Sequence, residues 1–251
     1  MHSDPSFPIS FQRGDETSEL IVPPLPADMI CAWCRGLKRT AAEMCVNCRD
    51  NLDALGRIVE IDPITLYYKP TKLRDWLTFY KSGDEALADS AAGEAVAHIL
   101  ANFFAANADR LSHLDIEGVV VVPSTHRAPP HPLAVLLQAT GASPYPVLTG
   151  LRRTAQPLGH NQPNVGAFVV VESLALKRVL LVDDVYTSGA RAQSAAEALT
   201  RAGVTVAAIW VVGRRYNREW SAESLEVVTE QASLPFEWNL DTRALRQTSR
   251  A

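Results

Sequence analysis

Two adjacent carboxylates, Asp183 and Asp184, stand shortly before a turn of small and hydroxyl-bearing residues, Thr187-Ser188-Gly189-Ala190. Paired carboxylates can accept hydrogen bonds from both hydroxyls of a ribose and can help to organise a magnesium ion nearby. Backbone N–H groups of such a turn bind phosphate, and Gly189 lets the backbone approach the ligand closely. The stretch therefore predicts a sugar-phosphate site. The alternative is a strand that ends in a polar, solvated cap, because Asp and Ser are common turn residues.

The acidic pair follows a continuous apolar run at 179–182, which is typical of a strand buried on both faces. A helical pattern follows from about 191 to 202. In such α/β units, ligands bind outside the carboxyl ends of the strands. A second apolar run at 118–122 also ends in polar residues, namely Ser124, Thr125 and Arg127. Two strands that each end in a potential phosphate-binding turn could contact the two ends of a single ligand.

The rest of the chain fits the same architecture. Apolar runs predict further strands at 58–61, 64–68, 145–148, 167–171 and 204–212, with Pro63 interrupting the first two. Helical spacing predicts helices at 71–81, from about 84 to 107, and at 132–140. Strands that alternate with helices indicate an α/β fold, with a twisted, mostly parallel sheet flanked by helices.

Residues 149–166, which carry Arg152 and Arg153, show little periodicity. A segment of this length without regular structure is uncommon in a compact domain unless it forms a lid or a binding loop. Its cations could close over a pyrophosphate, exclude water and stabilise the charge. The alternative is an exposed hairpin with incidental arginines.

All four cysteines of the chain lie close together as two Cys-x-x-Cys pairs: Cys31, Cys34, Cys45 and Cys48. Two such pairs can present four thiolates tetrahedrally, as a structural zinc site requires. Two disulfides or a redox-active pair are the alternatives. A closed four-thiolate site has no open position for a substrate, so we expect it to act in folding. Because the cysteines and the acidic pair are far apart in sequence, we expect the two sites to be independent.

Basic residues surround the cysteines: Arg35, Lys38, Arg39 and Arg49. They can neutralise a zinc–thiolate cluster. The alternative is that this segment is a zinc finger that contacts nucleic acid. Across the chain, 24 Lys and Arg stand against 28 Asp and Glu, a net charge of −4. This balance argues against bulk electrostatic binding to nucleic acid, although it allows a local basic patch.

Length and composition suit one large domain, or an ordinary domain with an accessory piece. The chain has 251 residues, of which 47% are hydrophobic. No apolar run approaches the roughly 20 residues that cross a bilayer, and residues 1–15 lack a signal-peptide layout, so we expect a cytoplasmic protein. We divide the chain into an extended or disordered lead (1–30), a zinc knuckle (31–56), an α/β domain (57–215) and a C-terminal tail that packs on the domain (216–251).

The pattern around the acidic pair closely resembles the phosphoribosyl-pyrophosphate (PRPP) signature of type I phosphoribosyltransferases. With the cysteine knuckle, the Lys81-Ser82-Gly83-Asp84 turn and the Val122-Pro123-Ser124-Thr125 turn in this order, the chain resembles the ComF family over roughly residues 31–215. These are zinc-knuckle proteins with a phosphoribosyltransferase-type domain, and some are implicated in DNA uptake during natural competence. The chain departs from the family pattern at Ala128–Pro132 and at Arg191, where the family often has a small hydroxyl residue.

The resemblance implies a type I phosphoribosyltransferase-like domain that transfers a phosphoribosyl group from PRPP, with magnesium, to an unidentified base or amine and releases pyrophosphate. It implies that Asp183 and Asp184 are the catalytic pair that holds the ribose. It places the 5′-phosphate at the residues that follow: Tyr186, Thr187, Ser188, Gly189 and Ala190. It places the pyrophosphate at the first turn and the loop: Ser124, Thr125, Arg127, Arg152 and Arg153. The alternative function is a PRPP- or nucleotide-responsive binding protein in nucleic-acid handling, whose knuckle contacts nucleic acid or a protein.

Overall fold

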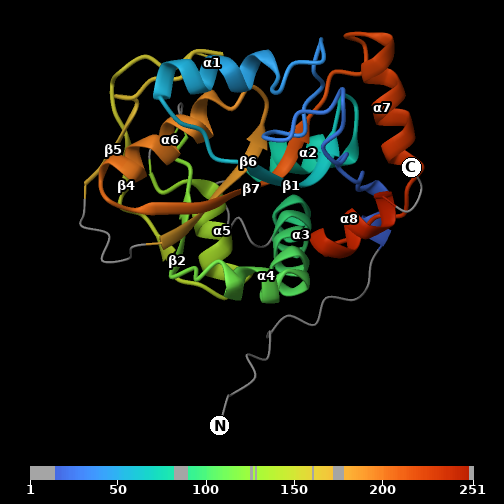
Figure 1. The fold of residues 1–251 in the computed structure, drawn as a ribbon. Helices are drawn as coiled ribbons and strands as arrows, with labels where there is room; N and C mark the ends of the chain where they lie inside the picture. Colours follow the sequence, from blue (N-terminus) through green and yellow to red (C-terminus); the bar gives the residue numbers. More distant parts are fainter. Residues whose placement is uncertain are drawn as a thin grey trace.

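The computed structural model describes residues 15–81, 90–124, 127, 129–159, 161–171 and 178–248. It is an α/β fold around a five-stranded sheet whose strand pairings are all parallel (Figure 1). The strand order is β1 (Ile61–Tyr67), β7 (Thr205–Arg215), β6 (Arg178–Tyr186), β2 (Gly118–Val121) and β3 (Val147–Leu148). The predicted sheet is therefore confirmed. Because β2 and β6 are neighbours, the two predicted phosphate turns follow adjacent strands at the same edge of the sheet.

Helices cover both faces of the sheet. Consecutive side chains of a strand point to opposite faces, so a strand that is apolar throughout contributes to the core on both sides of the sheet. In β6, Val179 and Leu181 belong to one core cluster, and Leu180 and Val182 belong to the other. Figure 1 shows α1 (Val46–Leu55) and α6 (Ala190–Arg201) on the first face; the second face is covered by α2 (Lys72–Phe79), α3 (Ala91–Ala106), α4 (Ala108–His113) and α5 (Pro132–Thr140). None of the helices in the described ranges combines the length and the hydropathy that a membrane span requires.

Pro63 does not interrupt β1, contrary to the prediction. It lies inside the strand and pairs with Val211 of β7. Proline is tolerated here because β1 is the edge strand of the sheet, where a missing N–H need not break a ladder. The predicted strand residues before Ile61 are not part of β1. Instead, Gln193 of α6 bonds to both backbone groups of Val59, at 2.9 Å to its N–H and 2.7 Å to its carbonyl.

The end of the lead segment packs against β1. After the 3-10 helix η1 (Asp15–Glu19), the side chains of Leu20, Ile21 and Val22 are buried. The N–H of Ile21 donates to Thr65 Oγ1 at 2.9 Å. Residues 20–22, which fall within the predicted lead, therefore belong to the hydrophobic core of the domain.

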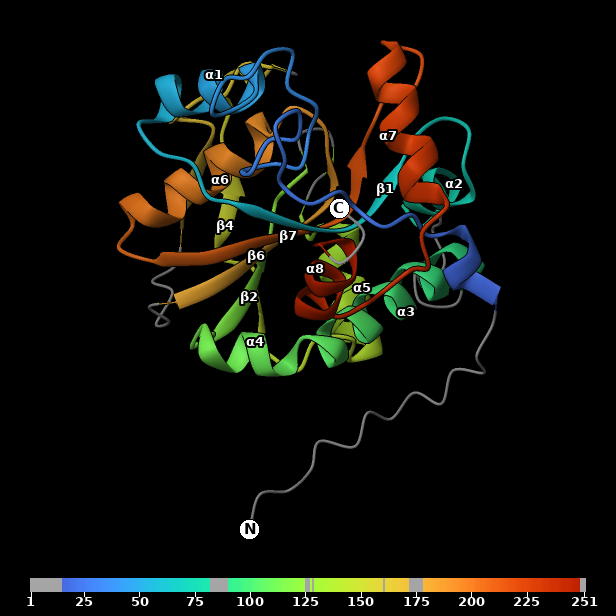
Figure 2. The ribbon, with the colours of Figure 1, turned by 45° about the vertical axis from the view of Figure 1, so that its right-hand side comes forward.

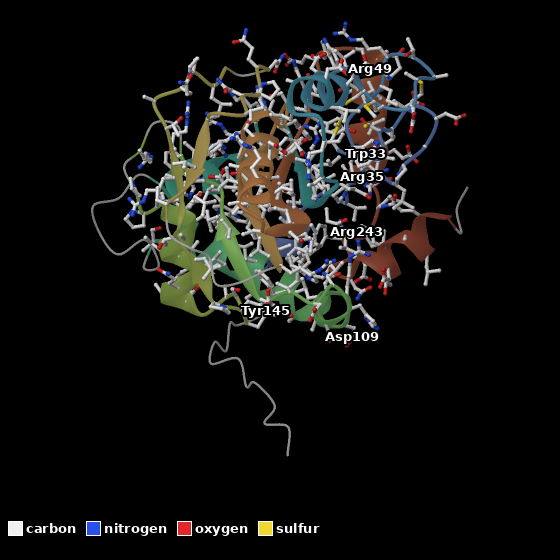
Figure 3. All side chains as sticks on the ribbon, turned by 60° about the vertical axis from the view of Figure 1, so that its left-hand side comes forward. Trp33, Arg35, Arg49, Asp109, Tyr145 and Arg243 are labelled. Atoms are coloured by element: carbon white, nitrogen blue, oxygen red, sulfur yellow. The ribbon has the colours of Figure 1, made fainter. Side chains whose placement is uncertain are left out.

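The C-terminal tail forms α7 (Ala222–Ala232) and α8 (Leu240–Thr248), which pack beside β1 (Figure 2). Arg243 of α8, labelled in Figure 3, is buried and donates to the carbonyls of Pro63 (3.0 Å) and Ile64 (3.1 Å). Of the aromatic residues in the tail, Phe236 and Trp238 pack against the core. Trp220 remains 52% exposed and does not anchor the tail in this way.

Candidate functional site

The predicted ligand-binding residues line two cavities at the carboxyl ends of β6 and β2. The first cavity, of about 450 Å³, includes Asp183, Asp184, Tyr186, Thr187, Ser188, Gly189, Ala190, Lys81 and Arg191. The second, of about 440 Å³, includes Ser124, Arg127, Arg152 and Arg153. Arg127 Nη1 donates to the carbonyl of Lys81 at 2.5 Å, which links the two groups of residues. Thr125 and the 82–84 part of the predicted lysine turn lie outside the described residues.

The acidic pair is buried and is held by cations. Arg191, at the second position of α6, donates from Nη2 to Asp183 Oδ1 (2.5 Å) and Asp184 Oδ1 (3.0 Å), and from Nε to Asp183 Oδ2 (3.2 Å). Lys81 forms an ion pair with Asp184 Oδ2, and the Tyr80 hydroxyl donates to the same oxygen at 2.7 Å. Arg191 and Lys81 keep 26% and 22% of their side chains exposed, whereas the carboxylates keep at most 1%. A ligand in this cavity therefore meets the cations before it meets the carboxylates.

The surroundings of the two carboxyl groups separate their acidities. Burial raises the pKa of Asp183 to about 7, against the opposing effect of Arg191. Burial also disfavours the charged form of Asp184, but Lys81 and Arg191 outweigh it and hold the pKa of that carboxyl well below its usual range. Near neutral pH the pair therefore carries between one and two negative charges, which face the two positive charges of Lys81 and Arg191.

We expect the raised pKa of Asp183 to lower the stability of the fold as the pH rises from about 4 to about 7. In this window the folded protein keeps a proton that the unfolded chain has lost, so the free energy of unfolding falls by at most about 1.4 kcal/mol per pH unit. His131, whose pKa burial lowers to about 4, acts in the opposite direction over part of the window. The measurement is therefore the difference in unfolding free energy between wild type and Asp183→Asn across this range. A difference that does not vary with pH would contradict the raised pKa.

The turn after β6 has a backbone suited to an anion. Gly189 has a φ of +90°, a conformation that L side chains rarely adopt, and α6 begins immediately after it. The first N–H groups of a helix have no acceptor within the helix, so they are available to a ligand. A Cβ at Gly189 would also collide with the hydroxyl of Tyr186. The side chain of Tyr186 is buried behind the turn and supports it, while Thr187 and Ser188 line the cavity.

The segment 149–166 contains part of a hairpin. β4 (Leu151–Arg153) pairs antiparallel with β5 (Phe168–Val170). Arg153 stabilises this hairpin by donating to three nearby carbonyls, those of Thr154 (2.8 Å), Gln156 (2.5 Å) and Ala167 (2.7 Å). Arg152 is exposed and, with Arg127, supplies cations to the second cavity. Arg153 therefore has a structural role in a hairpin, as the alternative predicts, whereas Arg152 is exposed and can contact a ligand in the second cavity.

The four cysteines converge in the knuckle. Their Sγ atoms lie within 4.8 Å of one another, all four side chains are buried, and none forms a disulfide. Cys45 precedes α1 as its N-cap and Cys48 lies in the first turn of this helix, so the helix orients one Cys-x-x-Cys pair toward the other. Four sulfur ligands at such separations form a possible metal site that is compatible with structural zinc.

We expect one zinc ion per chain in protein purified without chelator. Zinc holds its thiolate ligands only in the folded knuckle, so its binding energy contributes to folding, and chelation should unfold this segment. Metal analysis by mass spectrometry of the intact protein measures the stoichiometry. Zero zinc in wild type would contradict the assignment, and a Cys31→Ser, Cys48→Ser double variant provides the zinc-free control.

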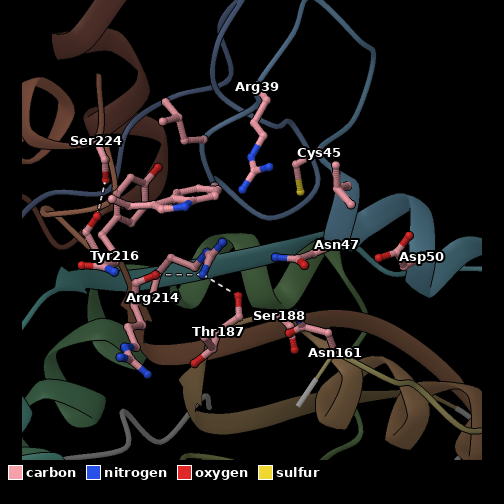
Figure 4. Close-up of a pocket in the computed structure, with 16 residues that line it drawn as sticks. Arg39, Cys45, Asn47, Asp50, Asn161, Thr187, Ser188, Arg214, Tyr216 and Ser224 are labelled. Carbon is pink, nitrogen blue, oxygen red and sulfur yellow. Dashed lines mark hydrogen bonds between the residues drawn. The ribbon is translucent and has the colours of Figure 1, made fainter. Parts of the chain in front are cut away.

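The knuckle contacts the turn after β6 directly, contrary to the expected independence of the two sites. Arg214, buried at the end of β7, donates from Nε to the carbonyl of Cys34 at 2.8 Å. Its Nη1 donates to the carbonyl of Thr187 at 2.8 Å (Figure 4). Its Nη2 lies 3.7 Å from the Cys34 sulfur. Asn51 of α1 donates to the carbonyl of Ser188 at 2.9 Å. The knuckle therefore bonds the backbone of the turn directly at Ser188, and Arg214 connects it to the turn at Thr187.

Four residues that organise the site are missing from the set predicted from the sequence: Tyr80, Lys81, Arg191 and Arg214. Lys81 and Arg191 belong to recognised motifs and could have been included, whereas Tyr80 and Arg214 carry no local signal. Chemically, the arrangement can bind one anion at the turn and its two cations, and a second anion near Arg127 and Arg152.

No protein-family model matches this chain, and no match to it is found among curated proteins.

Proposed function

We propose that the protein binds PRPP and transfers its phosphoribosyl group. The observation that carries the proposal is the pair of cavities at the ends of the adjacent strands β6 and β2, one lined by the turn at 187–190 and the other by Arg127 and Arg152. PRPP has a phosphate at one end and a pyrophosphate at the other, so it requires two anion sites with a sugar between them. The contact between Arg127 and Lys81 joins a residue of one cavity to a residue of the other, which supports a single ligand that reaches both.

In the proposed reaction the C1–O bond to pyrophosphate breaks and a C1–N bond to a base or amine forms. Pyrophosphate leaves with the bonding electrons, C1 gains oxocarbenium character, and the acceptor nitrogen loses a proton to water. Arg127 and Arg152 would stabilise the charge that develops on the pyrophosphate, and magnesium would supply further positive charge there. The turn at 187–190 would hold the 5′-phosphate, with Asp183 and Asp184 beside the ribose.

On this proposal, residues 57–215 form a type I phosphoribosyltransferase-like domain and the chain is a ComF-type protein. The parallel sheet, the acidic pair before the turn and the four clustered cysteines support it. The zinc knuckle then has a structural role, which it exerts through Arg214 and Asn51 on the phosphate turn.

Calorimetric titration with PRPP and magnesium tests the proposal, and we expect saturable binding. Gly189→Ala should weaken it by about 10-fold or more, because the backbone conformation costs roughly 1–2 kcal/mol with a Cβ and the Tyr186 hydroxyl must move. Gly203→Ala is the matched control: Gly203 has a φ of +84° at the other end of α6, with nothing near its absent Cβ. A folded wild-type sample that binds no PRPP would overturn the proposal.

The second candidate is a binding protein that does not turn over PRPP. It is favoured by Arg191, which covers the carboxylates, and by a third cavity of about 440 Å³ between the knuckle, the turn and the tail (Figure 4). At this cavity the guanidinium of Arg39 lies over the exposed ring of Trp220, 4.4 Å from its centroid. An exposed aromatic ring beside arginines is a stacking platform for single-stranded nucleic acid.

Two measurements distinguish this candidate from the enzyme. PRPP binding without pyrophosphate release across a broad panel of bases and amines would support it, and release that depends on Asp183 or Asp184 would reject it. Binding of single-stranded DNA should weaken with salt, because phosphate contacts release counterions. Trp220→Ala should weaken this binding by about 10-fold, as expected for loss of one stacked base. Leu225→Ala, an exposed change on α7, is the control.

A further inference from the structure

The floor of the cavity after β6 is cationic although two carboxylates lie beneath it. Asp183 and Asp184 are 1% and 0% exposed, and the partly exposed Arg191 and Lys81 lie over them. Arg191 bridges the pair, with Nη2 bound to one oxygen of each carboxylate. The two cations thus neutralise the pair from within the chain, and they are the charged groups that a ligand reaches first.

The oxygens of the pair are also largely occupied as hydrogen-bond acceptors. Each carboxylate oxygen accepts about two hydrogen bonds. Asp183 Oδ1 accepts from Arg191 and from the N–H of Asp184 (2.9 Å). Asp184 Oδ2 accepts from Tyr80 and is paired with Lys81. The remaining two oxygens each accept from Arg191. A divalent cation would have to compete with Arg191, which already binds both carboxylates, for these oxygens.

We propose that Arg191 and Lys81 take the place of a divalent cation at this end of the site, so that a sugar phosphate binds here without magnesium. Asp183 and Asp184 are then positioning residues, which hold the two cations against the phosphate turn. The inference rests on the proposed function for the identity of the ligand. Magnesium in the proposed reaction belongs to the pyrophosphate end, where Arg127 and Arg152 lie.

Titration with ribose 5-phosphate isolates this end, because the compound has the sugar and the 5′-phosphate but no pyrophosphate. Wild type should bind it with affinities in EDTA and in magnesium that agree within about twofold, a difference under about 0.5 kcal/mol. Arg191→Gln should weaken binding in EDTA by about 10- to 100-fold, as expected for the loss of charge-assisted hydrogen bonds. Magnesium should partly restore it, because the uncovered carboxylates can attract the ion. Arg191→Lys, which keeps the charge, should remain independent of magnesium.

Binding by wild type that requires magnesium, or an unchanged affinity of Arg191→Gln in EDTA, would overturn the inference. Lys81→Gln provides a second variant if Arg191→Gln does not fold, and it should weaken binding in EDTA in the same direction. Titration of wild type with PRPP and magnesium separates the inference from the proposed function. If ribose 5-phosphate binds in EDTA and this binding depends on Arg191, but PRPP does not bind, the proposed function fails and the inference stands. If PRPP binds to wild type and to Arg191→Gln equally in EDTA, the inference fails and the proposed function stands.

Discussion

Asp184→Asn should lower the free energy of unfolding by about 3 kcal/mol, near the low end of the range for breaking a buried ion pair. The carboxylate is 0% exposed and faces Lys81, Arg191 and the hydroxyl of Tyr80, and an amide cannot balance either cation. The low end applies because both cations keep part of their surface in water. Two adjacent carboxylates without cations would repel, and neutralising one would leave stability unchanged or raise it. In this fold the two cations reverse the sign of the expected change in stability.

Asp183→Asn should instead leave the free energy of unfolding at neutral pH unchanged or raise it, because burial raises the pKa of this carboxyl to about 7 and folding therefore favours its neutral form. Urea denaturation of both variants at neutral pH measures the ranking. Asp75→Asn is the control, since Asp75 is 52% exposed and pairs with Arg74 at 3.0 Å on the surface, where such pairs contribute at most about 1 kcal/mol. A gain in stability on Asp184→Asn, or equal losses in the two buried variants, would contradict the ranking.

Arg214→Gln should destabilise the protein by about 3–5 kcal/mol, because it removes a buried charge that lies against the four clustered cysteines, 3.7 Å from the sulfur of Cys34. It also leaves the carbonyls of Cys34, Tyr186 and Thr187 short of donors. Two of these carbonyls belong to the turn after β6 and the strand end before it, so under the proposed function PRPP affinity should fall by about 10-fold or more. Arg215→Gln is the matched control, since the neighbouring side chain makes none of these bonds.

Zinc removal or Cys34→Ser should loosen the same turn. Amide hydrogen exchange measured by mass spectrometry reports this without a ligand, and we expect faster exchange at residues 187–190 as well as in the knuckle. Strands β6 and β7 should remain protected, which shows that the effect is local. Unchanged exchange at 187–190 after zinc removal, with the sheet still protected, would mean that the turn does not depend on the knuckle.

Features that arise from local physical chemistry could be predicted from the sequence. The apolar run before Asp183 predicts a buried strand, and the turn with Gly189 predicts the sharp start of α6. The bounds of α5 at Pro132 and Thr140 follow from a proline suited to the first helical turn and from Gly141, which adopts a φ of +64° at its C-cap. The spacing of the four cysteines also predicts their convergence. In each case the residues that decide the structure are neighbours in the chain.

Only the tertiary structure decided what surrounds these local features. Pro63 is accommodated in β1 because β1 is an edge strand, which the strand's own residues do not reveal. The charge of the acidic pair depends on Lys81 and Tyr80, which come from another part of the chain. Arg214 joins the knuckle to the turn although it lies 180 positions from Cys34. The sequence pattern of one segment does not reveal which residues of another segment will contact it. Burial and opposite charge then decide whether two carboxylates repel each other or hold two cations in place.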